Sequence, residues 1–347
     1  MLPFASDYMH GMHEAVLSAL TRMHREPETG YGTDTYSARA REKLRRAMEA
    51  PQADIFFLSG GTQTNMVAIS ALLRPTEGVL SADTGHIEVH EAGAIEATGH
   101  KVLPLPSVDG KVSAQAVQHY CEHFYADETH THMVFPGALY LSHPTEYGTL
   151  YTKAELTALR EVCDRFGMRL YLDGARLGYA LGTPSSDVTL RVLATLCDAF
   201  YVGGTKVGAL CGEALVFPCG APRDMLTYIK QRGALMAKGF AIGAQFDALF
   251  TDGLYVRIGQ HAVAMAQRLK EAMLALGYPL YINSPTNQQF VTLTDAQYTF
   301  LSTKVSMSVW CPPENGKTVV RFATSWATTE EELFALISLL EQARALA

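Results

Sequence analysis

The chain has few charged residues and no excess of lysine and arginine. Of its 347 residues 18% are charged, and the formal net charge is -7. A nucleic-acid surface needs clustered basic side chains, so this composition disfavours one and leaves a small phosphate-bearing ligand possible. Hydrophobic residues make up 48% of the chain, enough for a large buried core. We therefore expect a globular protein whose partner is a small molecule and not a nucleic acid.

Long apolar runs and paired cysteines are also missing. No apolar run approaches the ~20 residues of a membrane-spanning helix. Residues 1–7 lack the basic stretch followed by an apolar stretch that marks a secretory signal. We therefore expect a cytoplasmic protein without membrane contact. The cysteines lack the spacing of zinc ligands, so we expect reduced core thiols and no metal site; they are Cys121, Cys163, Cys197, Cys211, Cys219 and Cys311.

Length and periodicity predict an α/β protein with two domains. A chain of 347 residues exceeds the size at which a single core stops growing. Short apolar runs alternate with helical periodicity from Asp54 to Phe166, which is typical of a wound, mostly parallel sheet. We place an N-terminal arm and a large domain in residues 1–245, and a small C-terminal α/β domain in residues 246–347. One long helical pattern, from Phe240 to Leu276, crosses this boundary.

Two polar residues at predicted strand ends are the strongest functional signal. Residues 169–172 form a short apolar run that stops at Asp173, and the run 198–202 leads through two glycines to Thr205 and Lys206. Ligands of open α/β sheets bind at the carboxyl ends of strands, so we expect Asp173 in a crevice and Lys206 in a loop. Either residue alone could be a helix cap or a surface lysine. Together they fit pyridoxal phosphate, which needs a lysine for a Schiff base and an acid to keep its ring nitrogen protonated.

A third strand end predicts an anion site. The buried-strand pattern of residues 54–59 runs into Gly60, Gly61 and Thr62, and an apolar helix follows. The first turn of a helix leaves backbone N–H groups unpaired, and the helix dipole favours an anion there. A phosphate would suit this site. Taken alone, the same pattern is an ordinary strand-to-helix turn, and it is neither a dinucleotide fingerprint nor a P-loop.

His86 follows another predicted strand, at an edge where its side chain could reach the same ligand. The alternative is that it only caps the helix start. We expect a helix beyond it that carries Glu88, His90, Glu91 and Glu96. His90 with Glu91 could suggest a metal, but no third ligand at helical spacing completes such a site.

In the order of its motifs, the chain resembles the threonine aldolase / β-eliminating lyase family of fold-type I pyridoxal-phosphate enzymes over essentially its whole length. The resemblance implies an aspartate-aminotransferase-like large domain and a homodimer or homotetramer whose active sites are shared between subunits. The matching residues are Ser6-Asp7, Tyr31-Gly32 with Asp34, Ser59-Gly60-Gly61-Thr62 with Asn65, His86-Ile87, Glu91-Ala92-Gly93, Asp173-Gly174-Ala175-Arg176, Lys206 and Arg321.

The resemblance also implies roles for these residues. Gly61 and Thr62 would hold the phosphate of pyridoxal 5'-phosphate. Lys206 would form the Schiff base, His86 would stack on the pyridine ring, and Asp173 would pair with the ring nitrogen. These last three are the expected catalytic residues.

Two arginines are similar to those that orient the substrate in this family. Arg321 would take the α-carboxylate of the substrate in a bidentate hydrogen bond, with Arg176 nearby. The other implied cofactor contacts are Arg176, Thr205 and Lys238, the last from a neighbouring subunit. The other implied substrate contacts are Ser6 and Tyr31.

The implied reaction is retro-aldol cleavage of a β-hydroxy-α-amino acid, of the L-threonine or L-allo-threonine type and with low specificity, to glycine and an aldehyde. β-Elimination, racemisation and transamination use the same lysine and aspartate, and a non-catalytic phosphate-binding α/β protein is a remote alternative. One departure from the family concerns the general base. Where the family has Glu-Asn-Thr-His-Asn, residues 142–146 read Ser-His-Pro-Thr-Glu, so Thr145 replaces the second active-site histidine.

Overall fold

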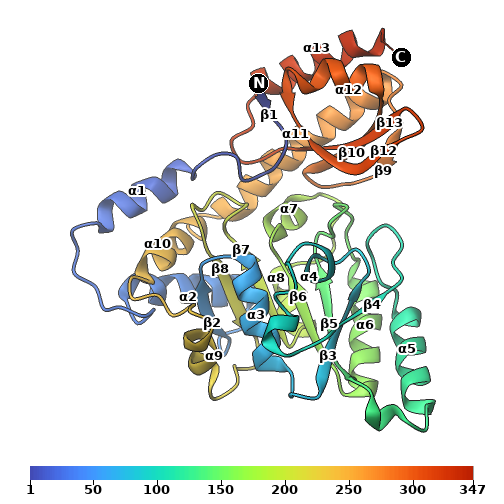
Figure 1. Cartoon of the computed structure of the whole chain (residues 1–347). Helices are drawn as coiled ribbons and strands as arrows, with labels where there is room; N and C mark the ends of the chain where they lie inside the picture. Colours follow the sequence, from blue (N-terminus) through green and yellow to red (C-terminus); the bar gives the residue numbers. More distant parts are fainter. Residues whose placement is uncertain (347) are drawn as a thin grey trace.

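Seven strands make the central sheet of the computed structural model, which describes residues 1–346 (Figure 1). Strand β8 runs antiparallel to its neighbours β2 and β7, and the other neighbouring pairs are parallel. This confirms the expected mostly parallel sheet. In spatial order the strands are β2 (Asp54–Leu58), β8 (Glu213–Phe217), β7 (Ala199–Gly203), β6 (Arg169–Asp173), β5 (Phe135–Ser142), β3 (Glu77–Ala82) and β4 (Val102–Leu105).

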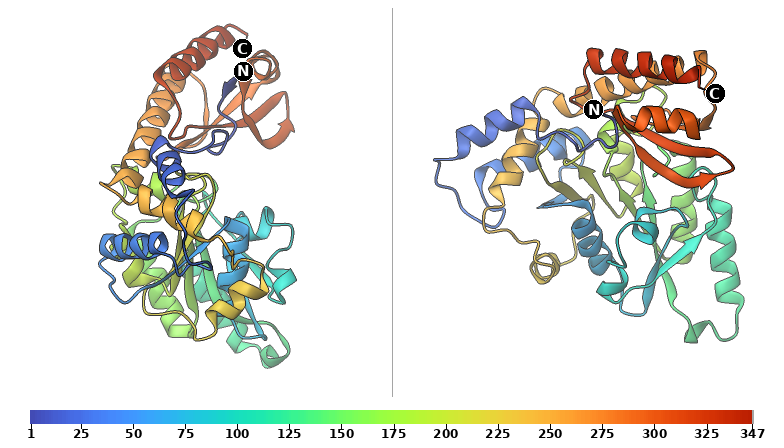
Figure 2. Two further views of the ribbon diagram at one scale, coloured as in Figure 1. Left: turned by 90° about the vertical axis from the view of Figure 1, so that its left-hand side faces the viewer. Right: turned by 45° about the horizontal axis from the view of Figure 1, so that its top comes forward.

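Both faces of this sheet are buried under helices (Figure 2). In β6, Leu170 and Leu172 belong to one core and Tyr171 to the other, because successive residues of a strand face opposite sides. Burial on both faces explains why the strands read as continuous apolar runs in the sequence. The first face is covered by α2 (Thr35–Met48), α5 (Ala114–Ala126), α6 (Lys153–Phe166) and α8 (Leu190–Leu196), and the second by α3 (Gly61–Leu72) and α9 (Met225–Gln231).

A second, antiparallel sheet lies at the top of Figure 1, near both termini. Its strands, in spatial order, are β12 (Ser308–Glu314), β13 (Lys317–Ala323), β10 (Gln288–Thr294) and β9 (Leu280–Ile282). Three helices share a separate core with it: α11 (Leu254–Ala275), α12 (Asp295–Ser302) and α13 (Glu330–Arg344). The protein therefore has a large α/β layer structure and a smaller α/β part.

The single long helix expected from Phe240 to Leu276 was wrong. Helix α10 (Phe240–Leu249) stops before Asp252 and Gly253, whose φ angles are 50° and 70°, and α11 starts afterwards. Left-handed backbone at two successive residues cannot continue a right-handed helix. The expected domain boundary at residue 245 lies inside α10, and the division into residues 1–245 and 246–347 stays a prediction.

The N-terminal arm joins the two parts of the protein. Strand β1 (Leu2–Pro3) pairs in parallel with β11 (Val305–Ser306), and Ala323 N donates to Phe4 O at 2.8 Å. The Ala5 carbonyl accepts a hydrogen bond from Arg321 Nη2 at 2.9 Å. The chain then returns to the central sheet, where α1 (Glu14–Met23) lies beside α10. Residues at the start of the chain are thus built into its C-terminal part.

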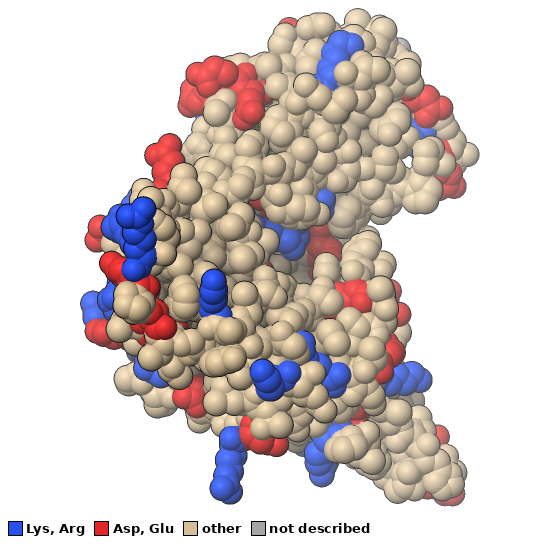
Figure 3. Space-filling view, turned by 60° about the vertical axis from the view of Figure 1, so that its left-hand side comes forward, with Lys and Arg blue, Asp and Glu red and all other residues tan. Residues whose placement is uncertain are grey.

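The surface carries charges of both signs. On the face shown in Figure 3, basic and acidic side chains are interspersed, and a hollow separates the upper and lower parts of the protein. Among residues 1–346, no helix is long and apolar enough to cross a membrane.

Candidate active site

Two adjoining cavities lie at the carboxyl ends of β5, β6 and β7. The strand-end cavity has a volume of about 220 Å³, and its walls include Gly61, Thr62 and Asp173. The Arg321 cavity, of about 670 Å³, reaches the C-terminal sheet, and its walls include Trp310 and Arg321. The two cavities therefore form one continuous hollow, because four residues line both of them: His86, Glu146, Arg176 and Lys206.

Asp173 ends β6 and is buried, as predicted. Its Oδ2 accepts hydrogen bonds from the Tyr140 hydroxyl at 2.7 Å and from Asn65 Nδ2 at 3.0 Å, and its Oδ1 accepts one from Ala175 N at 2.9 Å. Burial raises the pKa of such a carboxyl, but the charge of His86 and the hydrogen bonds that Asp173 accepts outweigh burial and hold the pKa of Asp173 below its usual 3.8. The carboxylate is therefore ionised at neutral pH.

Lys206 lies in the turn after β7, as the sequence predicts. A buried carboxylate braces this turn, since Gly204 N donates to Glu213 Oε2 at 2.9 Å and Thr205 Oγ1 donates to Glu213 Oε1 at 2.8 Å. Burial and the charge of Arg176 lower the pKa of Lys206. A larger neutral fraction makes its Nζ a better nucleophile. The Thr205 hydroxyl lies at the cavity wall, but it donates its hydrogen to Glu213 within the turn.

Two glycines let the Asp173 turn pack directly against the strand that leads to Lys206. A Cβ on Gly174 would lie 2.0 Å from Tyr201 O, and a Cβ on Gly203 would lie 2.3 Å from Ala175 O. Gly203 N also donates to Gly174 O at 3.0 Å. Any side chain at either position would push the two backbones apart, so glycine is required there.

Gly61 and Thr62 begin α3 at the wall of the strand-end cavity. Gly60 is the N-cap residue, and no side chain caps this helix. The backbone N–H groups of its first turn are therefore available to an anion, which the helix dipole also favours. The residues predicted to hold a phosphate are in a position to do so.

His86 begins the short helix α4 (His86–Val89) and lines both cavities. Its Nδ1 lies 2.9 Å from Oε1 of the buried Glu91, which also accepts a hydrogen bond from Asn65 Nδ2 at 2.8 Å. The longer helix expected to carry Glu91 and Glu96 was wrong, because α4 ends at Val89 and Ala92 has a φ of 52°. The break turns Glu91 back toward His86 and fixes the imidazole.

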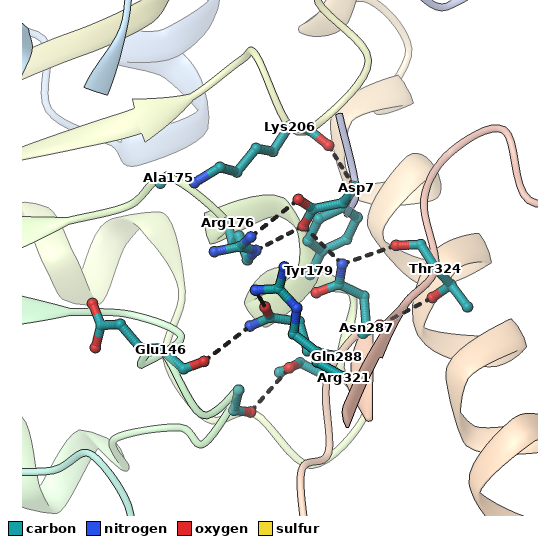
Figure 4. Close-up of polar contacts among 12 residues, drawn as sticks. Asp7, Glu146, Ala175, Arg176, Tyr179, Lys206, Asn287, Gln288, Arg321 and Thr324 are labelled. Carbon is teal, nitrogen blue, oxygen red and sulfur yellow. Dashed lines mark hydrogen bonds and ion pairs between the residues drawn. The ribbon is translucent and has the colours of Figure 1, made fainter. Parts of the chain in front are cut away.

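Arg176 and Arg321 both face the hollow, and both have partners within the chain (Figure 4). Arg176 donates to Asp7 through Nε at 2.7 Å and Nη2 at 3.1 Å, and Arg321 Nη1 donates to Gln288 Oε1 at 3.0 Å. Burial and the charge of Arg176 lower the pKa of Arg321 to about 10, so it stays protonated at neutral pH. Two guanidinium groups at one hollow favour an anionic ligand.

Three expected contacts lie away from both cavities within this chain. Ser6 is buried next to Asp7 but lines neither cavity. Tyr31 is 52% exposed and borders a separate hollow, and its N–H donates to Ala237 O at 3.2 Å. This bond brings Tyr31 next to the exposed Lys238. The roles of these three residues stay predictions.

The segment 142–146, in which Thr145 is expected to replace a histidine of the family, brings Glu146 to the hollow. The Thr145 hydroxyl lies 2.7 Å from the Thr149 hydroxyl within a turn. His143 is fully buried, and burial lowers its pKa to about 4. Glu146 instead lines both cavities. Sequence reasoning had assigned no role to Glu146, nor to the other residues that hold the site together: Asp7, Asn65, Tyr140, Glu91 and Glu213.

Known proteins resemble this chain in sequence and in fold. The sequence pattern of the beta-eliminating lyase family matches residues 3–296. The low specificity L-threonine aldolase of Pseudomonas sp. (strain NCIMB 10558) is 29% identical over 334 residues, which cover 94% of this chain and 93% of that protein. The structure of Leishmania major threonine aldolase is 41% identical and has a TM-score of 0.96, with 99% of this chain and 100% of that chain covered.

A more distant structure shows the fold alone. A Thermus thermophilus aspartate aminotransferase variant is 17% identical, has a TM-score of 0.71, and is matched over 99% of this chain and 96% of its own. The expected aspartate-aminotransferase-like architecture is thus confirmed. The chain belongs to the beta-eliminating lyase family and has the fold-type I architecture of pyridoxal-phosphate enzymes.

Proposed function

We propose that this protein is a pyridoxal-phosphate-dependent aldolase that cleaves β-hydroxy-α-amino acids of the threonine type, with low specificity, to glycine and an aldehyde. The observation that carries the proposal is that Lys206 and Asp173 share one cavity, which opens into a second cavity lined by Arg321. The threonine aldolases of Pseudomonas and Leishmania to which the chain is similar support this substrate class.

The strand-end cavity fits pyridoxal phosphate by its donor set. The uncapped start of α3, with Gly61 and Thr62, suits a phosphate. The ionised Asp173 carboxylate suits a protonated ring nitrogen, and Lys206, with its lowered pKa, suits attachment of the aldehyde. When bound, the cofactor supplies an electron sink for the bond pair released at the substrate Cα.

The chain's own residues supply orientation and charge. Arg321 would bind the substrate α-carboxylate with two parallel hydrogen bonds, which fixes the direction of the bonds at Cα. Asp173 would keep the ring nitrogen of the cofactor protonated, and His86, fixed by Glu91, forms one wall of the cavity. Arg176, held by Asp7, adds positive charge between the two cavities.

A product analysis tests this function. The purified protein, reconstituted with pyridoxal phosphate, should release glycine and acetaldehyde from L-threonine and L-allo-threonine. Ammonia and a keto acid without glycine would instead indicate β-elimination. Lys206→Ala should abolish both the visible absorption of the bound cofactor and glycine release, while Lys101→Ala, an exposed lysine, should change neither.

Subunit sharing, the remaining part of the proposal, concerns Lys238 and Tyr31. Both are exposed side by side, away from the hollow of their own chain, so we propose that they serve the site of a second subunit in a homodimer or homotetramer. Lys238→Ala and Lys206→Ala should each lower activity. Mixed subunits should regain activity, because one site of each hybrid pair then carries neither substitution. No recovery on mixing would refute the assignment of Lys238 to the site of a second subunit.

A further inference from the structure

Glu146 is the only carboxylate among residues 1–346 that lines both cavities. Its main-chain oxygen accepts a hydrogen bond from Gln288 Nε2 at 3.5 Å, and Gln288 Oε1 in turn accepts one from Arg321 Nη1 at 3.0 Å. In Figure 4, the Glu146 carboxylate and the Lys206 amine extend to the same side of the cluster. Glu146 therefore lies where the proposed carboxylate site and the proposed cofactor site meet.

A short chain of hydroxyl groups links Glu146 to Asp173. Ser142 Oγ lies 2.6 Å from Glu146 Oε1 and 3.1 Å from the Tyr140 hydroxyl, and Tyr140 donates to Asp173 Oδ2 at 2.7 Å. The His86 N–H also donates to Glu146 Oε1 at 3.0 Å. Both of these hydrogen bonds go to Oε1, and Oε2 accepts none from any other residue in the described part of the chain, so Oε2 is left for a ligand.

The series of hydrogen-bonding groups from Glu146 to Asp173 can hold one more proton. Tyr140 gives its hydrogen to the ionised Asp173, and Ser142 has a single hydrogen to give. If Glu146 is ionised, Ser142 donates to Glu146, and no proton lies between Ser142 and Tyr140. If Glu146 is protonated at Oε1, Glu146 donates to Ser142 and Ser142 donates to Tyr140, so every contact is a hydrogen bond. If the proton lies on Oε2 instead, Ser142 keeps its hydrogen bond to Oε1. The network accommodates both states of Glu146, which an acid–base residue requires.

The environment of Glu146 supports proton uptake. Burial raises the pKa of Glu146, and the nearby charge of Asp173 acts in the same direction. Hydrogen bonding from Ser142 opposes both effects without reversing them. A carboxylate with a raised pKa is a stronger base than an exposed one.

We propose that Glu146 is the catalytic base that removes the proton from the substrate β-hydroxyl, a role for which this chain offers no histidine at position 145. The inference rests on the function proposed above. The Oε2 atom takes the proton while the hydroxyl oxygen forms its second bond to Cβ. The Cα–Cβ bond breaks, its electron pair remains with Cα, and the aldehyde leaves. Cα later takes up one proton to give glycine, and Glu146 returns its proton to solvent, so the reaction balances without an oxidant or reductant.

Glu146→Gln tests this role because glutamine keeps the size of the side chain and an oxygen for Ser142 and His86 N, but cannot take a proton. We expect kcat for L-threonine cleavage to fall ~10²–10⁴-fold, with little change in KM. Exchange of the glycine Cα hydrogen in deuterated water needs no β-hydroxyl transfer, so the variant should keep it. Glu146→Asp should recover part of the cleavage, and Glu161→Gln, an exposed glutamate on α6, should behave as wild type.

A second measurement uses the cofactor-free protein. The infrared carbonyl stretch of a protonated carboxyl, taken as the difference between wild type and Glu146→Gln, should persist above pH 4.5, the usual pKa of a glutamate. Ser142→Ala should shift this band because Ser142 is the group next to Glu146 in the chain of hydrogen bonds. Absence of the band above pH 4.5 would count against the proposal.

The outcomes separate this inference from the function on which it rests. If the wild type releases aldehyde and Glu146→Gln does so at the same rate, the role of Glu146 is refuted and the aldolase function stands. If cleavage and glycine exchange fall equally in the variant, Glu146 only positions other groups. If the wild type exchanges glycine but cleaves no β-hydroxy amino acid, the aldolase function fails, and the proposed role of Glu146 fails with it.

Discussion

Replacing Asp7 with alanine should destabilise the folded protein by about 3–5 kcal/mol, the cost of breaking a buried ion pair from one side. The Asp7 side chain is 0% exposed and that of Arg176 is 13% exposed. Asp7 accepts hydrogen bonds from Arg176 Nε at 2.7 Å, Arg176 Nη2 at 3.1 Å and Asn287 Nδ2 at 2.9 Å. Alanine would leave a largely buried guanidinium and a buried amide without these acceptors.

Urea unfolding at neutral pH measures this effect, and an exposed ion pair gives the control. Arg46 and Glu42 pair at 2.7 Å with side chains 75% and 69% exposed, so Glu42→Ala should cost less than about 1 kcal/mol. Adding Arg176→Met to Asp7→Ala removes the charge that Asp7→Ala leaves unpaired. The double variant should therefore lose less free energy of unfolding than the two single variants lose in sum. A loss below about 1 kcal/mol for Asp7→Ala would refute the ion-pair argument.

The same pair predicts a pH dependence. Burial alone would raise the pKa of Asp7, but the charges of Arg176 and Lys206 and the hydrogen bonds from Arg176 and Asn287 together outweigh burial and lower this pKa below the usual 3.8. A carboxyl whose pKa is lowered by folding contributes stability that is complete above its unfolded pKa and is lost as the pH falls through its folded pKa. Wild-type protein should therefore lose this contribution below pH 3.8, and Asp7→Ala should lack that part of the acid-induced loss.

Three further substitutions test the site. Asp173→Asn should retain cofactor but lose glycine release at least ~10²-fold, because a neutral amide cannot hold the ring nitrogen protonated; absorbance and product assays measure both. Arg321→Lys should raise KM and lower kcat for L-threonine with cofactor absorbance unchanged, since an ammonium cannot form the bidentate hydrogen bond. Kinetics equal to those of the wild type would mean that another residue binds the substrate α-carboxylate. Gly174→Ala should cost at least ~1–3 kcal/mol by overpacking against Tyr201 O, 2.0 Å from the added Cβ, whereas Gly11→Ala, with no atom within 4 Å, should not; thermal melts compare them.

The sequence correctly predicted the positions of those site residues that come directly after a strand. Asp173 and Lys206 end buried apolar runs, and parallel strands bring such ends to one edge of the sheet. Glu146 follows β5 in the same way, so its place at the site could be predicted from the sequence.

Other parts of the site depend on backbone features that composition does not reveal. Glu91 reaches His86 because Ala92 adopts a φ of 52°, which alanine rarely does and which no periodicity predicts. The break between α10 and α11 has a similar cause at Asp252, where helical propensity on both sides hides the left-handed residue. The roles proposed for Tyr31 and Lys238 involve a second chain, which the fold of one chain does not contain.

The N-terminal arm has a consequence for the order of biosynthesis. The Ala5 carbonyl bonds to a guanidinium 316 residues later, and Leu2 and Pro3 pair with residues 305 and 306. On the ribosome, the arm emerges first and finds its partners only when the last strands have left the exit tunnel. The central sheet, complete by Phe217, can pair much earlier. The nascent chain should therefore have a folded central sheet while its first residues are still unpaired. The hollow between Lys206 and Arg321 should form in the last step of folding.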